Sequence, residues 1–209
     1  WQEHFKSYAK DRDVVQVLAF AKDANIAYVL SNVSRDKAAI YEYDIRARKL
    51  GEIVFEHRFF DAAGMSLRRV KDSQFGEVQW FGFGGPSEVD FYYQSDWFRD
   101  KDKQIAQALK LTEEPQQVID PATGRSATVP MRTKRNWSLV SASLDRNTIV
   151  FQVESPSEPA TFYLLRNNVL TTLSKAYPDI DPRALGEGKL VYYKARDGLD
   201  IPAFLYTPS

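Results

Sequence analysis

Several residue types that carry chemistry are scarce or absent in this 209-residue chain. It contains no cysteine, which excludes disulfides, thiolate metal sites and cysteine nucleophiles. Its two histidines, His4 and His57, are too few and too far apart in the sequence to suggest a metal site, and we assign each to the surface or to an interface. The sequence implies no cofactor.

Long apolar runs and a net charge are missing as well. No window approaches the roughly 18 consecutive apolar residues of a membrane-spanning helix. The 28 basic and 28 acidic side chains cancel, so no long-range field favours nucleic acid or an anionic membrane as a partner. The chain begins at Trp1 without an initiator methionine or a signal segment, and we expect it to be an internal part of a longer protein.

What the sequence does contain is a pattern of short strands. Hydrophobic residues make up 44% of the chain and fall in short runs rich in valine, isoleucine, tyrosine and phenylalanine. Two sets of four runs predict two antiparallel meanders: residues 14–20, 26–30, 38–44 and 51–55, then residues 137–144, 148–153, 161–166 and 169–173. An Asp-x-Asn turn precedes the second strand of each set, at Asp23 and at Asp145. Internal repetition of a meander predicts a β-propeller.

An irregular unit separates the two meanders. Its strands are predicted at residues 66–70, 77–83 and 89–93. A helix over residues 96–110 follows, with Ser95 or Asp96 as its cap. Residues 112–115 and 120–124 are interpreted as loop and turn.

The end of the chain changes character. Residues 177–182 interrupt the meander, and a hairpin follows over residues 190–206 with its turn at Asp197-Gly198. We predict a mainly β fold: a partial β-propeller of about three four-stranded antiparallel blades with one helical insertion and a C-terminal β-hairpin. The predicted domains are a partial propeller at residues 1–176, with blades near 14–56, 64–111 and 136–174, and a linker with the first hairpin of another domain at residues 177–209.

No motif for catalysis is found. Residues 64–68, Gly-Met-Ser-Leu-Arg, come nearest to the Gly-x-Ser-x-Gly nucleophile elbow, but an arginine replaces the second glycine and Ser66 falls in a predicted strand. The glycine-rich residues 82–86 end in proline with no lysine or helix after them, so we interpret them as a turn and not as a phosphate cradle. The basic residues 132–135 are interpreted as a solvated loop. We assign no catalytic residue and expect the chain itself to be inactive.

Several segments resemble one family. Residues 25–32, Asn-Ile-Ala-Tyr-Val-Leu-Ser-Asn, and the strand pair that follows to Glu52 resemble a propeller blade of bacterial prolyl oligopeptidases and their acylaminoacyl peptidase and dipeptidyl peptidase relatives. Residues 97–109 are similar to a helical insertion in one bacterial branch, and residues 170–173 to the closing strand of the final blade. The most specific segment, residues 194–208, resembles the first hairpin of the α/β-hydrolase domain that follows the propeller in this family.

The resemblance implies a serine peptidase whose Ser-Asp-His triad lies in a C-terminal α/β-hydrolase domain outside these residues. This chain would then be the non-catalytic propeller, partnered by its own hydrolase domain, that restricts access to short peptides in the bacterial cytoplasm or periplasm. Two alternatives stay open: a stand-alone propeller that is a scaffold for protein or cell-envelope binding, and a small β-rich hydrolase for which no triad can be assembled. Uncovered blade faces would favour self-association.

Chain direction predicts which loops face the substrate. In a four-stranded antiparallel blade, the link between the second and third strands shares an end with the link to the next blade, and the chain leaves the last blade toward Leu190 at that end. The loops at this end are residues 32–37, 56–61, 84–87 and 154–159. Within them, the charged side chains that could pair with the carboxylate or amine terminus of a peptide are Arg35, Arg58, Glu154 and Glu158. Solvated rim residues or blade-to-blade ion pairs are the alternative.

Overall fold

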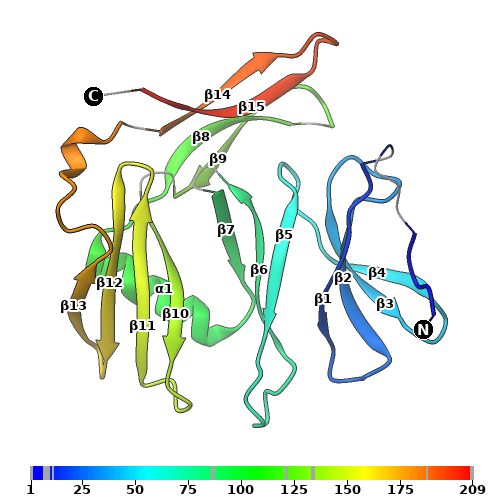
Figure 1. Ribbon diagram of the computed structural model, residues 1–209, viewed down its shortest axis with the longest axis horizontal. Coiled ribbons are helices and arrows are strands. Elements are labelled where there is room, and N and C mark those ends of the chain that lie inside the picture. The colour runs from blue at the N-terminus through cyan, green and yellow to red at the C-terminus, as the bar shows by residue number, and fades with distance from the viewer. Residues whose placement is uncertain are drawn as a thin grey trace. The chain divides into compact units, whose positions relative to one another are not determined.

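The computed structural model describes residues 2–6, 10, 12–85, 88–120, 122–132, 135–186 and 188–207 (Figure 1). The chain forms two compact units. Unit 1 comprises Trp1–Ile105 together with Asp120–Thr123, and unit 2 comprises Ala106–Ile119 and Gly124–Ser209.

Unit 1 begins with a four-stranded antiparallel sheet, which we call blade 1. Its strands are paired in sequence order: β1 (Val15–Phe20), β2 (Ile26–Ser31), β3 (Ala39–Asp44) and β4 (Lys49–Phe55). Alternation along β2 places Ala27 and Val29 on one face and Leu30 on the other, and all three side chains are buried. Both faces of blade 1 are therefore covered.

A three-stranded sheet, blade 2, follows in unit 1. Its strands are β5 (Ala62–Leu67), β6 (Val78–Gly85) and β7 (Glu88–Tyr93). In the described residues no fourth strand joins β7, and the chain continues into helix α1 (Asp96–Leu109). The Ser95 hydroxyl accepts a hydrogen bond from the Phe98 amide at 3.4 Å, which caps the helix, and Phe98 stacks on Tyr93. Three strands followed by a helix agree with the prediction for this unit, although the blade has one strand fewer than the four-stranded blades expected overall.

Blades 1 and 2 pack face to face around one core. Strand β5 contacts β1, β2 and β3. The buried side chains of this core are Leu30, Ala38, Ile40, Ala62 and Phe81. Phe55 stacks on Phe81 with ring centroids 4.7 Å apart and ring planes at 3°. Packing of one small sheet on the next is how the blades of a propeller are joined.

Unit 2 holds another four-stranded antiparallel sheet, blade 3. Its strands are β10 (Asn136–Ala142), β11 (Thr148–Ser155), β12 (Glu158–Arg166) and β13 (Val169–Lys175). The turns that precede β2 and β11 share one hydrogen bond. The Asp23 carboxylate accepts from the Asn25 amide at 2.9 Å, and the Asp145 carboxylate accepts from the Asn147 amide at 3.1 Å. The repeat read in the sequence is therefore a structural repeat.

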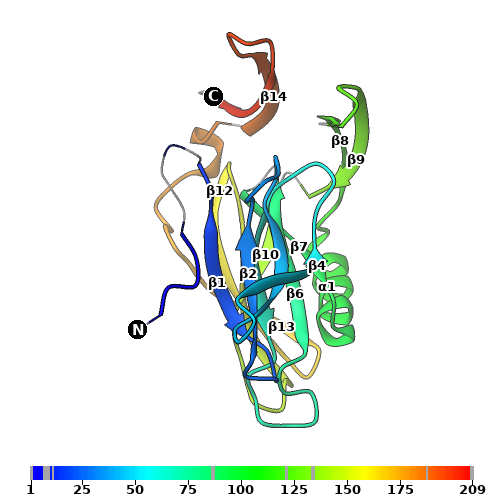
Figure 2. The ribbon, with the colours of Figure 1, turned by 90° about the vertical axis from the view of Figure 1, so that its right-hand side faces the viewer.

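Two hairpins complete unit 2, together with a short 3-10 helix, η2 (Pro182–Ala184). β8 (Glu114–Ile119) pairs with β9 (Ser126–Met131), and β14 (Gly188–Lys194) pairs with β15 (Asp200–Tyr206) (Figure 2). The Tyr192 hydroxyl accepts a hydrogen bond from the Ile119 amide at 3.3 Å and ties one hairpin to the other. Gly198 has φ +87°, as the predicted Asp-Gly turn requires.

The sequence does not predict the β8–β9 hairpin, because its strands are largely polar and each contains a proline. Pro115 lies opposite Pro130 in the ladder. A two-stranded ribbon tolerates this arrangement because each strand keeps an outer edge where a missing amide costs no sheet hydrogen bond. The predicted turn at residues 120–124 connects the two strands, with Pro121 outside the described residues.

The fold class is the predicted one: mainly β, with about three propeller blades, one helix and a C-terminal hairpin. The strand limits differ by a few residues, most at β5. That strand begins at Ala62 and not near residue 66, because Ala62 is buried in the core between the blades. The domain limit near residue 176 stays a prediction. Within the described ranges, no helix is long and apolar enough to cross a membrane.

The core between blades 1 and 2 leads to a stability prediction. Phe81→Ala should lower the free energy of unfolding by about 3–5 kcal/mol, because it leaves a cavity against Phe55 in a closed core. Phe20→Ala removes the same atoms from a side chain that is 64% exposed and should cost less than about 0.5 kcal/mol. Urea unfolding followed by tryptophan fluorescence measures both. Equal losses in the two variants would contradict this description of the core.

Candidate functional site

Three loops of unit 1 meet at one end of blades 1 and 2. The Asp61 carboxylate accepts from the Ala38 amide at 2.7 Å, which joins the β4–β5 loop to the β2–β3 loop. The Asp61 carbonyl accepts from the Gly84 amide at 2.9 Å, and the Ala38 carbonyl accepts from the Ala62 amide at 3.0 Å. The predicted loops at residues 32–37 and 56–61 therefore lie side by side. Pro86 and Ser87 of the predicted loop 84–87 lie outside the described residues.

Arg35 is held inside blade 1. Its Nη2 is 2.5 Å from Oε2 of Glu56, and its Nη1 donates to the Tyr41 hydroxyl at 3.1 Å. These hydrogen bonds, first with Tyr41 and then with Glu56, raise the pKa of Arg35 above its usual value. Because both ends of the guanidinium are engaged, Arg35 joins the β2–β3 loop to β3 and to the end of β4.

Arg58 lies in the β4–β5 loop and remains largely open. Its Nη2 is 2.5 Å from Oδ2 of Asp120, and the Arg58 side chain is 68% exposed while that of Asp120 is 4% exposed. The guanidinium also lies 5.4 Å from the centre of the Phe59 ring. Hydrogen bonding by Arg58, more than any other contact, lowers the pKa of Asp120 below its usual value, against the effect of burial. The buried Asp120 carboxylate thus binds one edge of the exposed Arg58 guanidinium.

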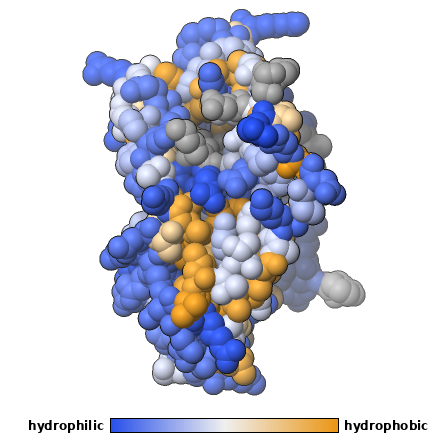
Figure 3. Space-filling view, turned by 90° about the vertical axis from the view of Figure 1, so that its left-hand side faces the viewer, coloured by the Kyte–Doolittle hydropathy of each residue, from blue (hydrophilic) through white to orange (hydrophobic). Residues whose placement is uncertain are grey.

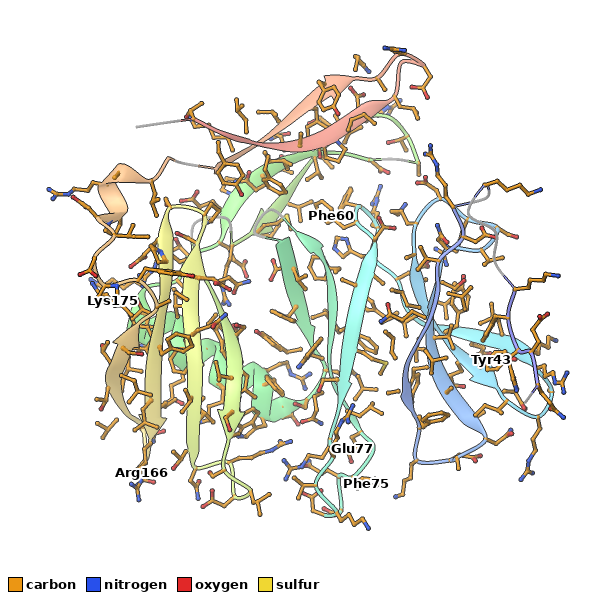
Figure 4. The ribbon with its side chains drawn as sticks, in the orientation of Figure 1. Tyr43, Phe60, Phe75, Glu77, Arg166 and Lys175 are labelled. Atoms are coloured by element: carbon orange, nitrogen blue, oxygen red, sulfur yellow. The ribbon has the colours of Figure 1, made fainter. Side chains whose placement is uncertain are left out.

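An aromatic cluster around His57 shapes the same loop. The His57 ring stacks on Phe83 with centroids 4.2 Å apart and planes at 5°, and on Phe60 at 5.3 Å (Figure 4). Its Nδ1 is 3.3 Å from the Phe59 amide and 3.2 Å from the Phe60 amide, and it accepts from both. The proton of the neutral ring therefore belongs on Nε2. Burial, and then the charge of Lys37, lower the pKa of His57 below 6.5.

Sequence reasoning missed this cluster, since it assigned His57 to the surface or to an interface. The available signal was the run of His57, Phe59 and Phe60 in a segment predicted as a loop, where three rings are unusual unless they pack together. Their stacking partner Phe83 lies more than twenty residues away, and only the pairing of blades brings it near.

Glu154 and Glu158 lie at one end of unit 2. Their predicted loop is shorter than expected, because β11 extends to Ser155 and β12 begins at Glu158. Oε2 of Glu158 is 3.1 Å from Nε of Arg135, whereas Glu154 is exposed and accepts from the Gln152 side-chain amide at 3.0 Å.

The same turn lies beside the start of β14. A Cβ built on Gly188 would be 3.1 Å from Cβ of Pro156, so the two segments touch. Within unit 2, Glu154 and Glu158 are therefore at the end from which the C-terminal hairpin extends. Arg35 and Arg58 share one end of unit 1. Contact of these four residues with a substrate stays a prediction.

The remaining sequence candidates have structural roles. Ser66 lies half-buried in β5, opposite Trp80, and not on a strand-to-helix turn. Residues 82–85 belong to strand β6, which corrects their interpretation as a turn. A Cβ at Gly82 would lie 3.1 Å from Cγ1 of Val89, so a larger residue there would require the Val89 side chain to shift. In the part of the chain that the structure describes, no group of three histidine or carboxylate side chains could hold a metal ion.

The basic run at residues 132–135 is only partly within the described residues, since Thr133 and Lys134 fall outside them. Arg135, which was interpreted as part of a solvated loop, is engaged within unit 2. Besides Glu158 it contacts the Leu109 carbonyl at 3.5 Å. Within unit 2, this end of the run therefore joins Leu109, the last residue of α1, to Glu158 of blade 3.

Comparisons with known proteins show the fold of this chain only. No protein-family model matches the sequence, and neither does any curated protein. A structure from a study of two prolyl endopeptidases, concerned with inter-domain dynamics in catalysis and specificity, is similar with a TM-score of 0.50 and 15% identity, over 96% of this chain and 25% of that one. Prolyl oligopeptidase B from Galerina marginata, bound to a 25mer macrocyclization substrate, gives a TM-score of 0.49 and 13% identity, over 98% of this chain and 24% of that one.

The chain therefore spans about a quarter of the length of these peptidases. The likeness to the prolyl endopeptidase covers nearly the whole chain and shows that the two share a fold. The prolyl oligopeptidase family stays a prediction from the sequence.

The environment of His57 predicts a pH dependence of stability. A group whose pKa is lowered by folding contributes fully above its unfolded pKa and loses that contribution as the pH falls below it. Lowering the pH from about 7.5 to 5.5 should therefore reduce the free energy of unfolding. The reduction should be smaller in His57→Asn, whose Oδ1 can accept from the same amides without titrating. Urea unfolding across this range tests both proteins, and identical pH profiles would contradict the assignment.

Proposed function

We propose that this chain is the substrate-gating propeller portion of a serine peptidase. The peptidase would hydrolyse short peptides with a Ser-Asp-His triad in a C-terminal α/β-hydrolase domain. The observation that carries the proposal is the fold shared with a prolyl endopeptidase over 96% of the chain. The resemblance of residues 194–208 to the first hairpin of such a hydrolase domain supports it independently.

The β14–β15 hairpin supports a following domain. It pairs with no blade strand among the described residues. Its large apolar side chains that remain exposed are Tyr193, Leu199, Phe204, Leu205 and Tyr206. An isolated two-stranded hairpin is marginally stable, and a sheet of a hydrolase domain would cover these side chains. This exposure argues against a stand-alone scaffold, which would leave these apolar side chains in water.

The access of peptides to the hydrolase domain would depend on the loops at one end of the blades. Arg58 is the best placed of the four charged candidates, because Asp120 holds one edge of its guanidinium and 68% of the side chain stays open. It could bind the carboxylate of a short peptide, while the exposed Glu154 could bind an amine. In a closed cavity a charged hydrogen bond is stronger than in water. Arg35 and Glu158 could contribute only by exchanging partners, because each is already paired.

The chain by itself should be inactive. It offers no serine on a nucleophile elbow, so the 209 residues should hydrolyse neither peptides nor esters and should not react with a fluorophosphonate probe. A longer product of the same gene that includes the proposed hydrolase domain should react with the probe and cleave chromogenic peptides. Turnover by the 209-residue chain that disappears in Ser66→Ala would overturn the proposal, and so would an unreactive longer product.

In the full-length enzyme, Arg58→Ala should raise KM for short peptides about 10-fold or more and change kcat less, as expected for lost ground-state binding through a charged hydrogen bond. The same peptides with an amidated C-terminus should be insensitive to the substitution. Alanine at Arg35 or Glu158 should change KM in the same sense.

Arg166→Ala is the matched control, because Arg166 is exposed at the far end of β12 from Glu158 (Figure 4). Steady-state kinetics over peptides of increasing length measure the effect. If Arg58→Ala weakens acid and amide peptides equally, Arg58 does not bind the carboxylate.

A further inference from the structure

The β4–β5 loop is anchored at both ends to the β2–β3 loop. At its start, Oε2 of Glu56 is 2.5 Å from Nη2 of Arg35. At its end, the Asp61 carboxylate accepts from the Ala38 amide at 2.7 Å. Residues 57–60 lie between the two anchors, so their conformation can change while the ends of the loop stay in place.

The middle of this loop turns around the imidazole of His57. Its Nδ1 accepts from the Phe59 amide at 3.3 Å and from the Phe60 amide at 3.2 Å (Figure 4). Arg58 lies between the acceptor and the two donors in the sequence, so it is at the centre of the turn. The stacking of the ring on Phe83 and Phe60 holds its orientation.

The surroundings of His57 favour its neutral form. Burial, and then the positive charge of Lys37 in the β2–β3 loop, lower the pKa of His57. Strand β6, on which the ring stacks, contains no titratable residue. The other charged residues of the two loops, each already bound to another group, are Arg35, Asp36, Glu56, Arg58 and Asp61. At neutral pH the ring is therefore uncharged and accepts from both amides.

Protonation of His57 would remove this acceptor. An imidazolium carries a proton on both ring nitrogens. The Phe59 and Phe60 amides would then face an N–H, or a C–H if the ring turns over, and neither group accepts a hydrogen bond. The turn around Arg58 therefore cannot keep its hydrogen bonds when His57 is charged.

The same turn sets the position of the Arg58 guanidinium. This group lies 5.4 Å from the centre of the Phe59 ring, and its Nη2 is 2.5 Å from Oδ2 of Asp120. Asp120 is buried, and its other oxygen accepts from the Ala122 amide at 3.0 Å, so its position does not depend on the turn. Opening of the turn would therefore move Arg58 and Phe59 relative to a fixed carboxylate.

We propose that neutral His57 is a positioning residue for Arg58, and that protonation of His57 releases the guanidinium and weakens the binding of an anionic ligand. The coupling of the two side chains rests on contacts within unit 1 alone. The identity of the ligand, the carboxylate terminus of a short peptide, rests on the proposed function. The sign follows from the hydrogen bonds: the ligand binds well above the pKa of His57, and binding is lost as the pH falls through it.

The coupling can be measured by NMR on the 209-residue chain labelled with 15N. Between about pH 7.5 and 5.5, the amides of Phe59 and Phe60 and the Nε–H of Arg58 should shift together with one midpoint. The Arg58 signal is identified by its loss in Arg58→Ala. Arg68 is the internal control, because its Nε donates to the Asp72 carboxylate at 3.0 Å in the β5–β6 loop, and its signal should not follow this midpoint.

Two substitutions remove the ring but place an acceptor at different positions. The side-chain oxygen of His57→Asn stands where Nδ1 stands and can accept from the same amides without titrating. That of His57→Gln stands one bond further out, near the position of Nε2. The Arg58 signal of His57→Asn should be insensitive to pH and lie nearer to that of the unmodified chain than the signal of His57→Gln. His4 remains in both variants, so its titration is common to them.

Association between copies of the chain would also shift signals, and the apolar surface of blade 3 makes this control necessary. Figure 3 shows an apolar stripe on the side of the molecule where β12 and β13 lie in Figure 1. Val169 and Leu173 of β13 are 64% and 51% exposed. The midpoint of the Arg58 signal should be the same at two protein concentrations, because the coupling acts within one copy.

The full-length enzyme tests the consequence for peptides. KM for a peptide with a free carboxylate, divided by KM for the same peptide with an amidated C-terminus, should rise at least about 3-fold from pH 7.5 to 5.5. The division removes the pH dependence of the catalytic triad, which acts on both peptides. In His57→Asn the ratio should not change with pH.

The inference is overturned if the Phe59 and Phe60 amides shift while Arg58 does not, if His57→Asn and His57→Gln behave alike, or if the KM ratio of the unmodified enzyme is independent of pH. The NMR result does not depend on peptidase activity. An inactive longer product would therefore overturn the proposed function and leave the measured coupling of His57 to Arg58 standing.

Discussion

In blade 1 both faces of the sheet are covered, and much of unit 1 follows from how that is achieved. A β-sheet rich in valine, isoleucine and aromatic residues on both sides cannot leave either side to water without a large cost in apolar exposure. In blade 1, one side packs on Ala62 and Phe81 of blade 2, and on the other side Phe5, Val15, Ile45 and Leu50 pack against the buried side chains. Each covering contact involves only neighbouring segments, so stability is built up from nearest-neighbour packing, as in other repeat architectures.

Face-to-face packing also decides which loops meet. When blade 2 covers blade 1, the β2–β3 and β4–β5 loops come together, and Asp61 joins them with hydrogen bonds to Ala38 and Gly84. Some charged side chains of these loops join strands, and others remain exposed to water. Arg35 is used to join strands, whereas Arg58 keeps most of its guanidinium in water because its partner Asp120 supplies only one carboxylate edge. An exposed cation held by a buried anion is well suited to bind an anionic ligand.

Much of the fold and part of the site can be read from the sequence, and the limits have physical causes. The meanders of blades 1 and 3 are predictable because alternation and turn chemistry act within a few residues of one another. The β8–β9 hairpin is not, because its prolines and glutamines carry neither signal. The loops that bear Arg35 and Arg58 follow from chain direction, but the partners of those side chains do not. Glu56 lies 21 residues from Arg35, and Asp120 lies 62 residues from Arg58.

The sequence by itself determined the fold class, the repeated Asp-x-Asn turn, the helix at Asp96 and the absence of a catalytic motif, because each depends on local periodicity or on residue types. Only the tertiary structure decided that β8 and β9 form a hairpin, that His57 accepts from two amides beneath Phe83, and that Phe5 packs on the face of blade 1 turned away from blade 2. These features depend on which sheets pack together. Packing brings together residues that are distant in the chain. Any apolar side chain can pack where two sheets meet, so its residue type alone does not show which residues it contacts.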